Sequence, residues 1–218
     1  MELLSDIEVR VIGSLIEKEI TTPDNYPLSL NALVNACNQS SNRDPVVHYD
    51  DVTVKAAVDR LRKQSLVRSI QGAGERVIKY LHLLADALDL DRAQLAVLDV
   101  LMLRRPQTLG EVRTRASRMY EFQRLEDVEG TLDGLATRAP EPLVVRLERQ
   151  AGQKEARFAH LLSGEPEVAP AQALHVDVVP NSEPALDRLG QLEAVVESLQ
   201  KEVAQLRAEI AELRRVFD

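Results

Sequence analysis

Residues 50–83 read DDVTVKAAVDRLRKQSLVRSIQGAGERVIKYLHL, and this stretch decides the expected fold. Apolar residues recur at helical spacing in its first part, which predicts a helix that begins at residue 50 or 51. Residues 66–71 and 76–83 have the composition of strands, and the glycine-containing loop between them predicts a β-hairpin. A helix followed by such a hairpin is typical of a winged helix, a helix-turn-helix variant with a β-wing. The apolar face of the helix comprises Val54, Ala57, Val58 and Leu61.

Two further helices are expected before this stretch. Ser5 and Glu8 have the spacing of a capping box, which predicts a helix start, and this helix must end before Pro23. Ser29 is the expected cap of a second helix, and the polar loop 38–45 follows it. The apolar faces comprise Ile7, Val11, Ile12, Leu15 and Ile16 in the first helix, and Leu30, Leu33, Val34 and Cys37 in the second.

The same order of elements then repeats. Residues 79–84 read KYLHLL, and residues 157–162 read RFAHLL. A repeat at this distance indicates a duplicated domain rather than a solenoid. We therefore predict a mainly α fold with small β-wings (α+β), with one winged-helix domain at residues 1–84 and a second at 85–164. The expected elements of the second domain are a helix from about Asp91, a helix with a capping box at Thr108 and Glu111, a helix with Leu125, Val128, Leu132 and Leu135 on its apolar face, and strands at 143–148 and 154–161.

The last part of the chain has a different composition. Four prolines fall within a stretch that predicts a flexible linker at residues 165–185. Residues 186–218 carry a heptad repeat with mostly β-branched residues at a and leucine at d, which favours a parallel two-stranded coiled coil and hence a homodimer. The alternative is a single amphipathic helix folded back on the body. The predicted dimerisation residues are Leu189, Leu192, Val196, Leu199, Val203, Leu206, Ile210 and Leu213.

The negative charge is concentrated in this tail. The net charge of the chain is −8, and residues 165–218 carry 5 basic and 11 acidic side chains. Each predicted domain is therefore almost neutral and lacks the overall basic excess of a strong DNA binder, although a local basic patch is compatible with that balance. The single cysteine excludes an intrachain disulfide, and neither a signal peptide nor a membrane span is recognisable. We expect a cytoplasmic protein.

Four segments resemble a known family. Residues 21–45 read TTPDNYPLSLNALVNACNQSSNRDP, which is similar to the signature of the YceH-type family of bacterial tandem winged-helix proteins. Residues 72–82 (GAGERVIKYLH) resemble the wing of that family's first domain. Residues 103–115 (LRRPQTLGEVRTR) and 152–162 (GQKEARFAHLL) resemble its second domain. The resemblance covers residues 1–164 and implies the duplicated fold; it implies DNA binding only by analogy of fold.

The sequence offers little for catalysis. The four histidines are scattered, and His82 and His160 stand at equivalent strand ends, which favours a structural hydrogen bond there. Cys37 lies on an apolar helix face and is expected to be a buried, inert thiol. No spacing of cysteine, histidine and acids fits a zinc site, and the loop with Gly72 and Gly74 lacks the lysine of a phosphate loop. We expect neither enzyme activity nor a metal or cofactor.

The candidate DNA contacts lie in the first domain. Helix-turn-helix proteins place the recognition helix in the major groove and use flanking segments on phosphates. Residues 50–79 carry seven basic and four acidic side chains, a net charge of +3. Asp50, Asp51 and Asp59 oppose phosphate binding on the same helix, so an ordinary solvated face of mixed charge is the alternative. The candidate DNA-binding residues are Lys55, Arg62, Lys63, Arg68, Arg76 and Lys79.

The corresponding helix of the second domain is acidic. It carries Glu126, Asp127, Glu129 and Asp133, whereas the arginines of that domain, Arg113, Arg115, Arg118 and Arg124, precede it. We expect this acidic helix to pack on the first domain or to bind a protein. The sequence thus favours a non-enzymatic, dimeric DNA-binding protein with double-stranded DNA as its partner. The alternative is a protein-interaction adaptor that does not bind DNA.

Overall fold

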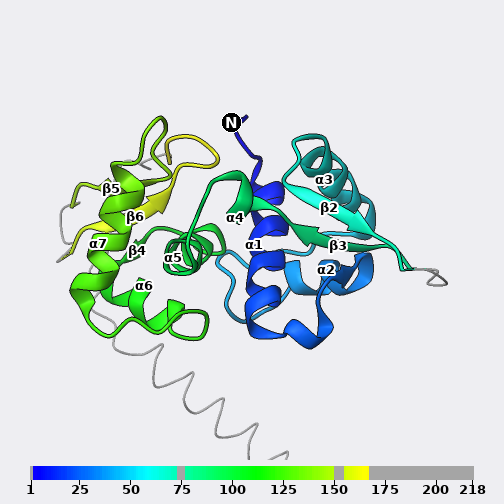
Figure 1. Ribbon diagram of the computed structural model, residues 1–218, viewed down its shortest axis with the longest axis horizontal. Coiled ribbons are helices and arrows are strands. Elements are labelled where there is room, and N and C mark those ends of the chain that lie inside the picture. Colours follow the sequence, from blue (N-terminus) through cyan, green and yellow to red (C-terminus); the bar gives the residue numbers. More distant parts are fainter. Residues whose placement is uncertain (1, 73–76, 150–154, 167–218) are drawn as a thin grey trace, which may run out of the picture. The chain divides into compact units, whose positions relative to one another are not determined.

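A computed structural model describes residues 2–72, 77–149 and 155–166 of the chain. The coiled coil predicted at residues 186–218, with all its dimerisation residues, lies outside the described residues. So do the linker from residue 167 onward and the candidate DNA contact Arg76. Over the described residues the fold is a mixture of helices and two small antiparallel sheets, which confirms the α+β class (Figure 1).

The first half of the structure, residues 6–82, contains three main helices and three strands. The capping box of Ser5 and Glu8 is present, and Ser29 and Asp50 cap the next two helices, as expected from the sequence. The elements are α1 (Asp6–Thr21), the 3-10 helix η1 (Pro23–Asn25), β1 (Leu28–Ser29), α2 (Leu30–Cys37), α3 (Asp51–Lys63), β2 (Val67–Ile70) and β3 (Lys79–His82).

The hairpin of this half belongs to a three-stranded sheet. The strand order is β1-β3-β2, so β3 lies between the hairpin partner β2 and the short β1. Val67 pairs with His82 and Ile70 with Lys79. The hairpin strands are shorter than predicted, because regular backbone pairing joins only residues 67–70 to residues 79–82. Strand β1 was not predicted, since two residues carry no detectable alternation.

Apart from η1, the described part of the second half, residues 92–160, has the same element order and the same sheet topology, β4-β6-β5. Asp91 and the Thr108–Glu111 pair cap its helices as predicted. One expectation was wrong: Leu125 is 38% exposed, because it is the first residue of its helix and precedes the turn that reaches the core. The elements are α5 (Arg92–Met102), β4 (Gln107–Thr108), α6 (Leu109–Ala116), α7 (Leu125–Ala136), β5 (Val144–Leu147) and β6 (Arg157–His160), with α4 (Leu84–Ala87) joining the halves.

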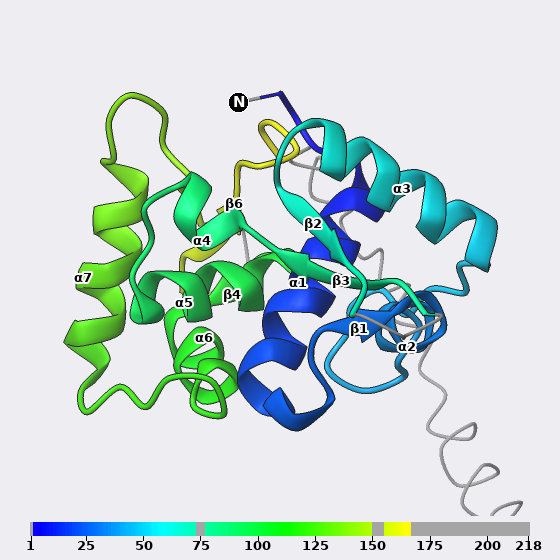
Figure 2. The same cartoon turned by 45° about the vertical axis from the view of Figure 1, so that its right-hand side comes forward.

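Helix α1 lies at the centre of the structure (Figure 2). It packs on α2 and α3 of its own half and on α5 of the other. One hydrophobic cluster therefore includes buried residues of both halves. The crossing of α1 and α5 is close at Gly13, where an added Cβ atom would lie 2.8 Å from Leu103 Cδ2. The second half is thus held on the first by a shared core. The boundary near residue 84 stays a prediction.

Candidate nucleic-acid interface

Helix α3 presents its apolar side to the core and its charged side to solvent. Val54, Ala57, Val58 and Leu61 are fully buried, as predicted. Thr53 donates its backbone N–H to Asp50 Oδ1 at 2.8 Å, and hydrogen bonds from Thr53 lower the pKa of Asp50. The helix start is therefore fixed by an ionised carboxylate, which suits the helix dipole but repels a phosphate.

Two of the candidate DNA contacts share one carboxylate. Lys55 Nζ lies 2.5 and 2.7 Å from the two carboxylate oxygens of Asp59, and Arg62 Nη1 lies 3.5 Å from Asp59 Oδ1. The hydrogen bond from Lys55 is the main cause that lowers the pKa of Asp59. Lys55 and Arg62 point outward as predicted, yet both are engaged within their own helix. Surface pairs of this kind are worth about 0–1 kcal/mol, so a phosphate can displace them.

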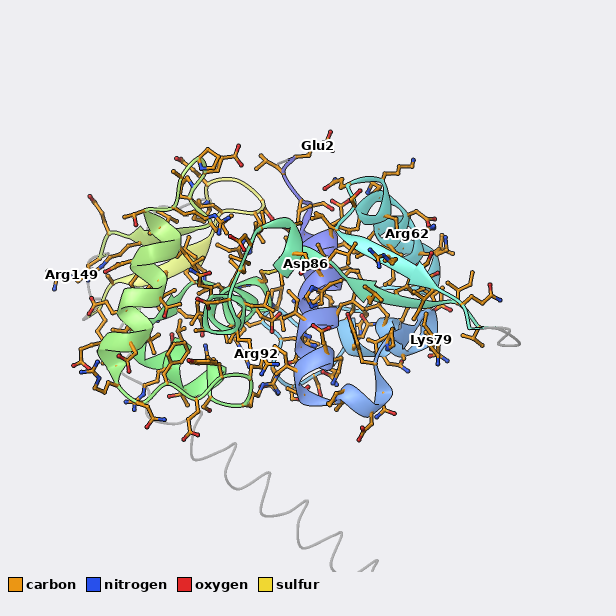
Figure 3. The ribbon with its side chains drawn as sticks, in the orientation of Figure 1. Glu2, Arg62, Lys79, Asp86, Arg92 and Arg149 are labelled. Carbon is orange, nitrogen blue, oxygen red and sulfur yellow. The ribbon has the colours of Figure 1, made fainter. Side chains whose placement is uncertain are left out.

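The other candidate residues differ in their surroundings. Lys63 ends α3 and Arg68 lies on β2; both are exposed, and within residues 2–72, 77–149 and 155–166 neither forms an ion pair. Lys79 is half-buried on β3, and Figure 3 shows it on the same half as Arg62. Lys63 and Arg68 are therefore the candidates that a phosphate would meet first.

Apolar side chains are also exposed on the first half, and no sequence pattern predicted this exposure. Val52, at the start of α3, is 76% exposed. Val77 and Ile78, just before β3, are 52% and 45% exposed, and Ile70 on β2 is also exposed. Because Ile70 and Arg68 are two positions apart on one strand, they share the strand face opposite the core. The helix α3 and the hairpin thus combine free cations with apolar groups.

The acidic helix α7 packs on its own half. Val128, Leu132 and Leu135 are buried against α5, α6 and β5, while Glu126 and Asp133 stay exposed. Of the two alternatives expected for α7, packing on the first domain was wrong, and binding of a protein stays a prediction. The reason is that its apolar stripe is needed to close the core of the second half, and the halves meet through α1 and α5 instead. The acidic face of α7 remains a surface that repels DNA.

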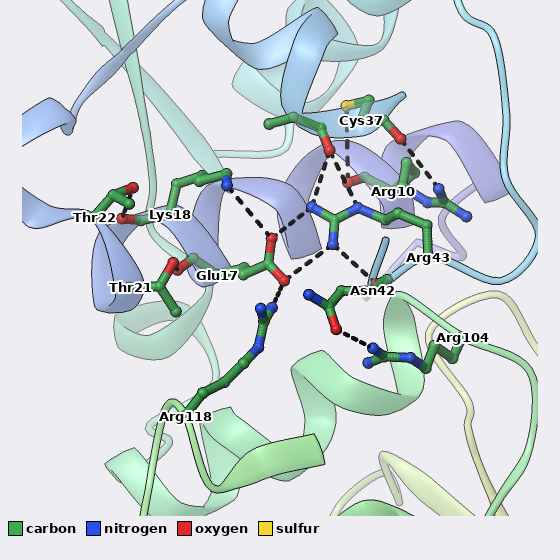
Figure 4. Close-up of polar contacts among 11 residues, drawn as sticks. Arg10, Glu17, Lys18, Thr21, Thr22, Cys37, Asn42, Arg43, Arg104 and Arg118 are labelled. Carbon is green, nitrogen blue, oxygen red and sulfur yellow. Dashed lines mark hydrogen bonds and ion pairs between the residues drawn. The ribbon is translucent and has the colours of Figure 1, made fainter. Parts of the chain in front are cut away.

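A buried ionic cluster joins the two halves (Figure 4). The Arg43 guanidinium donates to both carboxylate oxygens of Glu17, at 3.0 and 2.6 Å, and the side chains are 0% and 1% exposed. Arg118, which follows α6 in the second half, forms an ion pair with the same carboxylate. Glu17 on α1 therefore links the loop after α2 to the second half. We call Glu17, Arg43 and Arg118 the interhalf cluster.

The loop 38–45 completes this joint. Arg104 donates to Asn42 Oδ1 at 2.7 Å, and the backbone N–H of Asp44 donates to the Leu103 carbonyl at 3.0 Å. Arg43 also donates to the Ala36 carbonyl, which ties the loop to the end of α2. The loop 38–45, for which the sequence predicted only a polar character, thus provides hydrogen bonds between the halves.

The titratable residues singled out from the sequence have structural surroundings. His82 Nε2 lies 2.6 Å from Glu19 Oε2, as expected for a strand-end hydrogen bond. The Nδ1 atoms of both His82 and His160 have no partner in the part of the chain described here. The shared role predicted for the two histidines is therefore seen only at His82. Burial raises the pKa of the Cys37 thiol to about 11, which keeps it protonated at neutral pH, as expected for an inert thiol.

Asp99 on α5 is fully buried beside this joint. Neither carboxylate oxygen has a hydrogen-bond partner among the described residues, and burial raises the pKa of Asp99 well above its usual value despite the nearby Arg43 and Arg104. An ionised carboxylate without partners is costly in an apolar interior, so Asp99 stays protonated to a higher pH than an exposed aspartate does.

Replacement of Asp99 by asparagine is expected to stabilise the protein increasingly as the pH rises. The unfolded chain ionises Asp99 near pH 4, while the folded chain holds it protonated to higher pH, so the wild type loses stability over that interval. Asparagine does not titrate, and each unit of the pKa shift is worth about 1.4 kcal/mol. Urea unfolding of both proteins at pH 4 and pH 7.5 measures this difference. A difference that is the same at both pH values would contradict the assignment.

The described residues contain no group of three or more histidine, cysteine, aspartate or glutamate side chains placed to hold a metal ion. In the same residues every helix is too short or too polar to cross a membrane.

Residues 4–153 match a protein family described as "Protein of unknown function, DUF480". The chain belongs to this family. A "UPF0502 protein" of Geotalea uraniireducens is 51% identical over 215 residues, which cover 99% of this chain and 95% of the relative. Another, of Opitutus terrae, is 50% identical over 200 residues, covering 91% and 84%. A third, of Pectobacterium carotovorum, is 44% identical over 210 residues, covering 94% and 95%. The resemblance to the YceH-type family is thereby confirmed.

In this member of the DUF480 family, the motif that carried the resemblance lies at the joint. Residues 21–45 include the loop that supplies Asn42 and Arg43 to the contacts between the halves. The similarity also extends past residue 164, because almost the whole chain aligns with the Geotalea relative. The end of the longest motif therefore supplies contacts between the halves.

Proposed function

We propose that both halves are winged-helix domains and that the first binds duplex DNA without catalysing a reaction. Three helices followed by a hairpin, with a third short strand against the hairpin, match the order of elements in a winged helix. Helix α3 then takes the place of the recognition helix, and the β2–β3 hairpin takes the place of the wing. The observation that carries the DNA-binding proposal is the pair of exposed cations Lys63 and Arg68 on these two elements, which form no ion pair with any other described residue.

The charges on α3 set the expected mode of binding. Lys63 and Arg68 would contact phosphates, and Lys55 and Arg62 would exchange Asp59 for phosphates as the duplex approaches. Asp50 and Asp59 reduce the attraction. We therefore expect binding that depends strongly on salt, with few phosphate contacts from each chain. The coiled coil predicted at residues 186–218 would pair two first halves in the cytoplasm and so double those contacts.

Charge reversal of both free cations is expected to abolish most of this binding. The double variant Lys63→Glu/Arg68→Glu should bind a fluorescent duplex at least about tenfold more weakly than the wild type at low salt, because two phosphate contacts become repulsive. The double variant Arg92→Glu/Arg149→Glu has the same change of charge at exposed sites on the second half and serves as the control (Figure 3).

Fluorescence anisotropy across a salt series measures both variants with the full-length chain. The Lys63/Arg68 variant should also show a smaller dependence of affinity on salt. Equal affinities of the two double variants would show that α3 and its hairpin are not the DNA-binding face.

A second candidate function is protein binding by the same face. The exposed Val52, Val77 and Ile78 favour it, because apolar groups on a polar surface are typical of interaction sites. The acidic surface of α7 and the near neutrality of each half agree with it. This function predicts a stoichiometric partner in a native pull-down, loss of that partner in a Val77→Asp/Ile78→Asp variant, and no retention of DNA.

A further inference from the structure

A cavity of about 390 Å³ lies where the start of α1 meets the end of α5 and the chain after β6. None of its lining residues belongs to α3 or the first hairpin, so it is distinct from the proposed DNA-binding face. Both halves contribute to it, because Asp6 belongs to α1 and the other lining residues to the second half and the chain segment that follows it. The polar residues that line it are Asp6, Arg104, Arg105, His160, Ser163 and Glu165.

Two adjacent arginines form one side of the cavity. Arg104 is half-buried and uses one nitrogen to donate to Asn42 Oδ1, which leaves other N–H groups of its guanidinium for a ligand. Burial, together with Arg115 and Arg43, lowers the pKa of Arg104. Arg105 is 71% exposed, and its Nε atom lies 3.7 Å from Asp44. Two neighbouring guanidinium groups that still have N–H groups to donate match the geometry of carboxylate and phosphate groups.

Two buried polar atoms belong to the residues that line the cavity. His160 Nδ1 and Ser163 Oγ are shielded from solvent and have no hydrogen-bond partner among the described residues. Buried polar side chains in native proteins almost always have such a partner. A hydroxyl donates or accepts, and a neutral imidazole has one nitrogen of each kind, so either atom can bond a ligand after a rotation of its side chain turns it from its shielded position into the cavity.

Acidic groups limit where an anion can lie. Asp6 acts electrostatically on His160, which places its carboxylate on the histidine side of the cavity, and the exposed Glu165 lies at the chain segment after β6. An anion is therefore attracted to the end formed by Arg104 and Arg105 and repelled from the end formed by Asp6. Burial keeps the pKa of His160 low, at about 4, so the ring is neutral before a ligand binds.

We propose that this cavity binds a small metabolite through an oxyanion, a phosphate or a carboxylate, held by Arg104 and Arg105 with hydrogen bonds to His160 and Ser163. The rest of the ligand extends toward Leu101, Pro106 and Ala159, which supply the apolar part of the lining. Because Asp6 comes from the first half, the bound ligand contacts both halves at once.

The test uses the full-length protein at pH 7, titrated separately with inorganic phosphate and with succinate. The imidazole signals of His160 in NMR spectra and the heat of binding report on the site. We expect a saturable shift of the His160 signals and a higher His160 pKa in the complex, because a nearby anion favours the imidazolium form. The probe that saturates at the lower concentration identifies whether the site prefers phosphate or carboxylate.

Three variants make the assignment specific. Arg105→Gln is expected to weaken binding about tenfold through the loss of a charge-assisted hydrogen bond, and Asp6→Asn is expected to tighten it. Arg92→Gln, an exposed arginine outside the cavity, should leave the affinity unchanged. The proposal is overturned if neither probe shifts the His160 signals, or if Arg105→Gln and Arg92→Gln weaken binding equally.

Discussion

Replacement of Glu17 by glutamine is expected to lower the free energy of unfolding by about 3–5 kcal/mol, because it leaves the charge of Arg43 buried without its counterion. The Arg43 side chain is 0% exposed and has both carboxylate oxygens of Glu17 within hydrogen-bond distance. Glutamine has almost the same shape, so the loss reflects charge and hydrogen bonding rather than a cavity. Arg118 loses its partner in the same variant, which weakens the contact between the halves.

Urea unfolding of the full-length chain measures this effect. Glu126→Gln makes the same chemical change at an exposed position of α7 and is expected to alter the free energy of unfolding by no more than about 0.5 kcal/mol. If Glu17→Gln were as mild as Glu126→Gln, the interhalf cluster would not be needed for stability, and the joint would depend on the apolar core and the hydrogen bonds of the loop 38–45.

Replacement of Gly13 by alanine is expected to destabilise the protein by about 1–3 kcal/mol, although alanine is the better helix former. The added Cβ atom would lie 2.8 Å from Leu103 Cδ2 and 3.2 Å from Asp99 Oδ1. Both neighbours are buried and belong to the second half, so they cannot move away without disturbing its core. The close crossing of α1 and α5 therefore requires glycine at this position.

Gly130→Ala is the matched control for this variant. Gly130 lies within α7, and a Cβ atom there would have no neighbour within 4 Å, so only the gain in helix propensity remains. We expect Gly130→Ala to stabilise the protein by about 0.5–1 kcal/mol. Thermal unfolding should thus shift in opposite directions for the two variants. A stabilising Gly13→Ala would mean that α1 and α5 are not packed as closely as described.

Much of the local structure was predictable from short-range signals. The capping boxes at Ser5 and at Thr108 fix helix starts through contacts three residues apart, and such contacts are visible in any sequence. The buried face of α3 followed from its periodicity. The ion pair between Lys55 and Asp59 also has a local signal in the sequence, because an acid and a base at the spacing i,i+4 lie on the same side of a helix.

The joint between the halves was not predictable in the same way. Arg10, Gly13 and Glu17 form a stripe along α1 that has the composition of a solvent-facing side, yet all three are buried. The stripe is buried because Arg43 and Arg118 reach Glu17 from distant parts of the chain, and no local pattern encodes such contacts. The one local signal is Gly13, which lies at helical spacing between Arg10 and Glu17 and indicates a close helix contact on this side of α1.

The candidate surfaces also combine features that local patterns predict with features that depend on distant parts of the chain. The outward direction of Lys55 and Arg62 followed from helical periodicity, whereas the exposure of Val77 and Ile78 depends on where β3 begins, which the sequence placed too early. The cavity beside Arg104 joins residues from α1 and the end of β6, so it follows only from the tertiary arrangement.

Recovery of genomic DNA fragments by the full-length protein across a salt series tests the central claim, DNA binding by the first half, most directly. We expect retention at low salt that falls steeply as salt rises, with enriched sequences surviving longest if α3 reads base edges. The Lys63→Glu/Arg68→Glu variant should recover little DNA, and the Arg92→Glu/Arg149→Glu variant should recover as much as the wild type. No recovery by the wild type even at low salt would contradict DNA binding and would favour the protein-binding function of the same face.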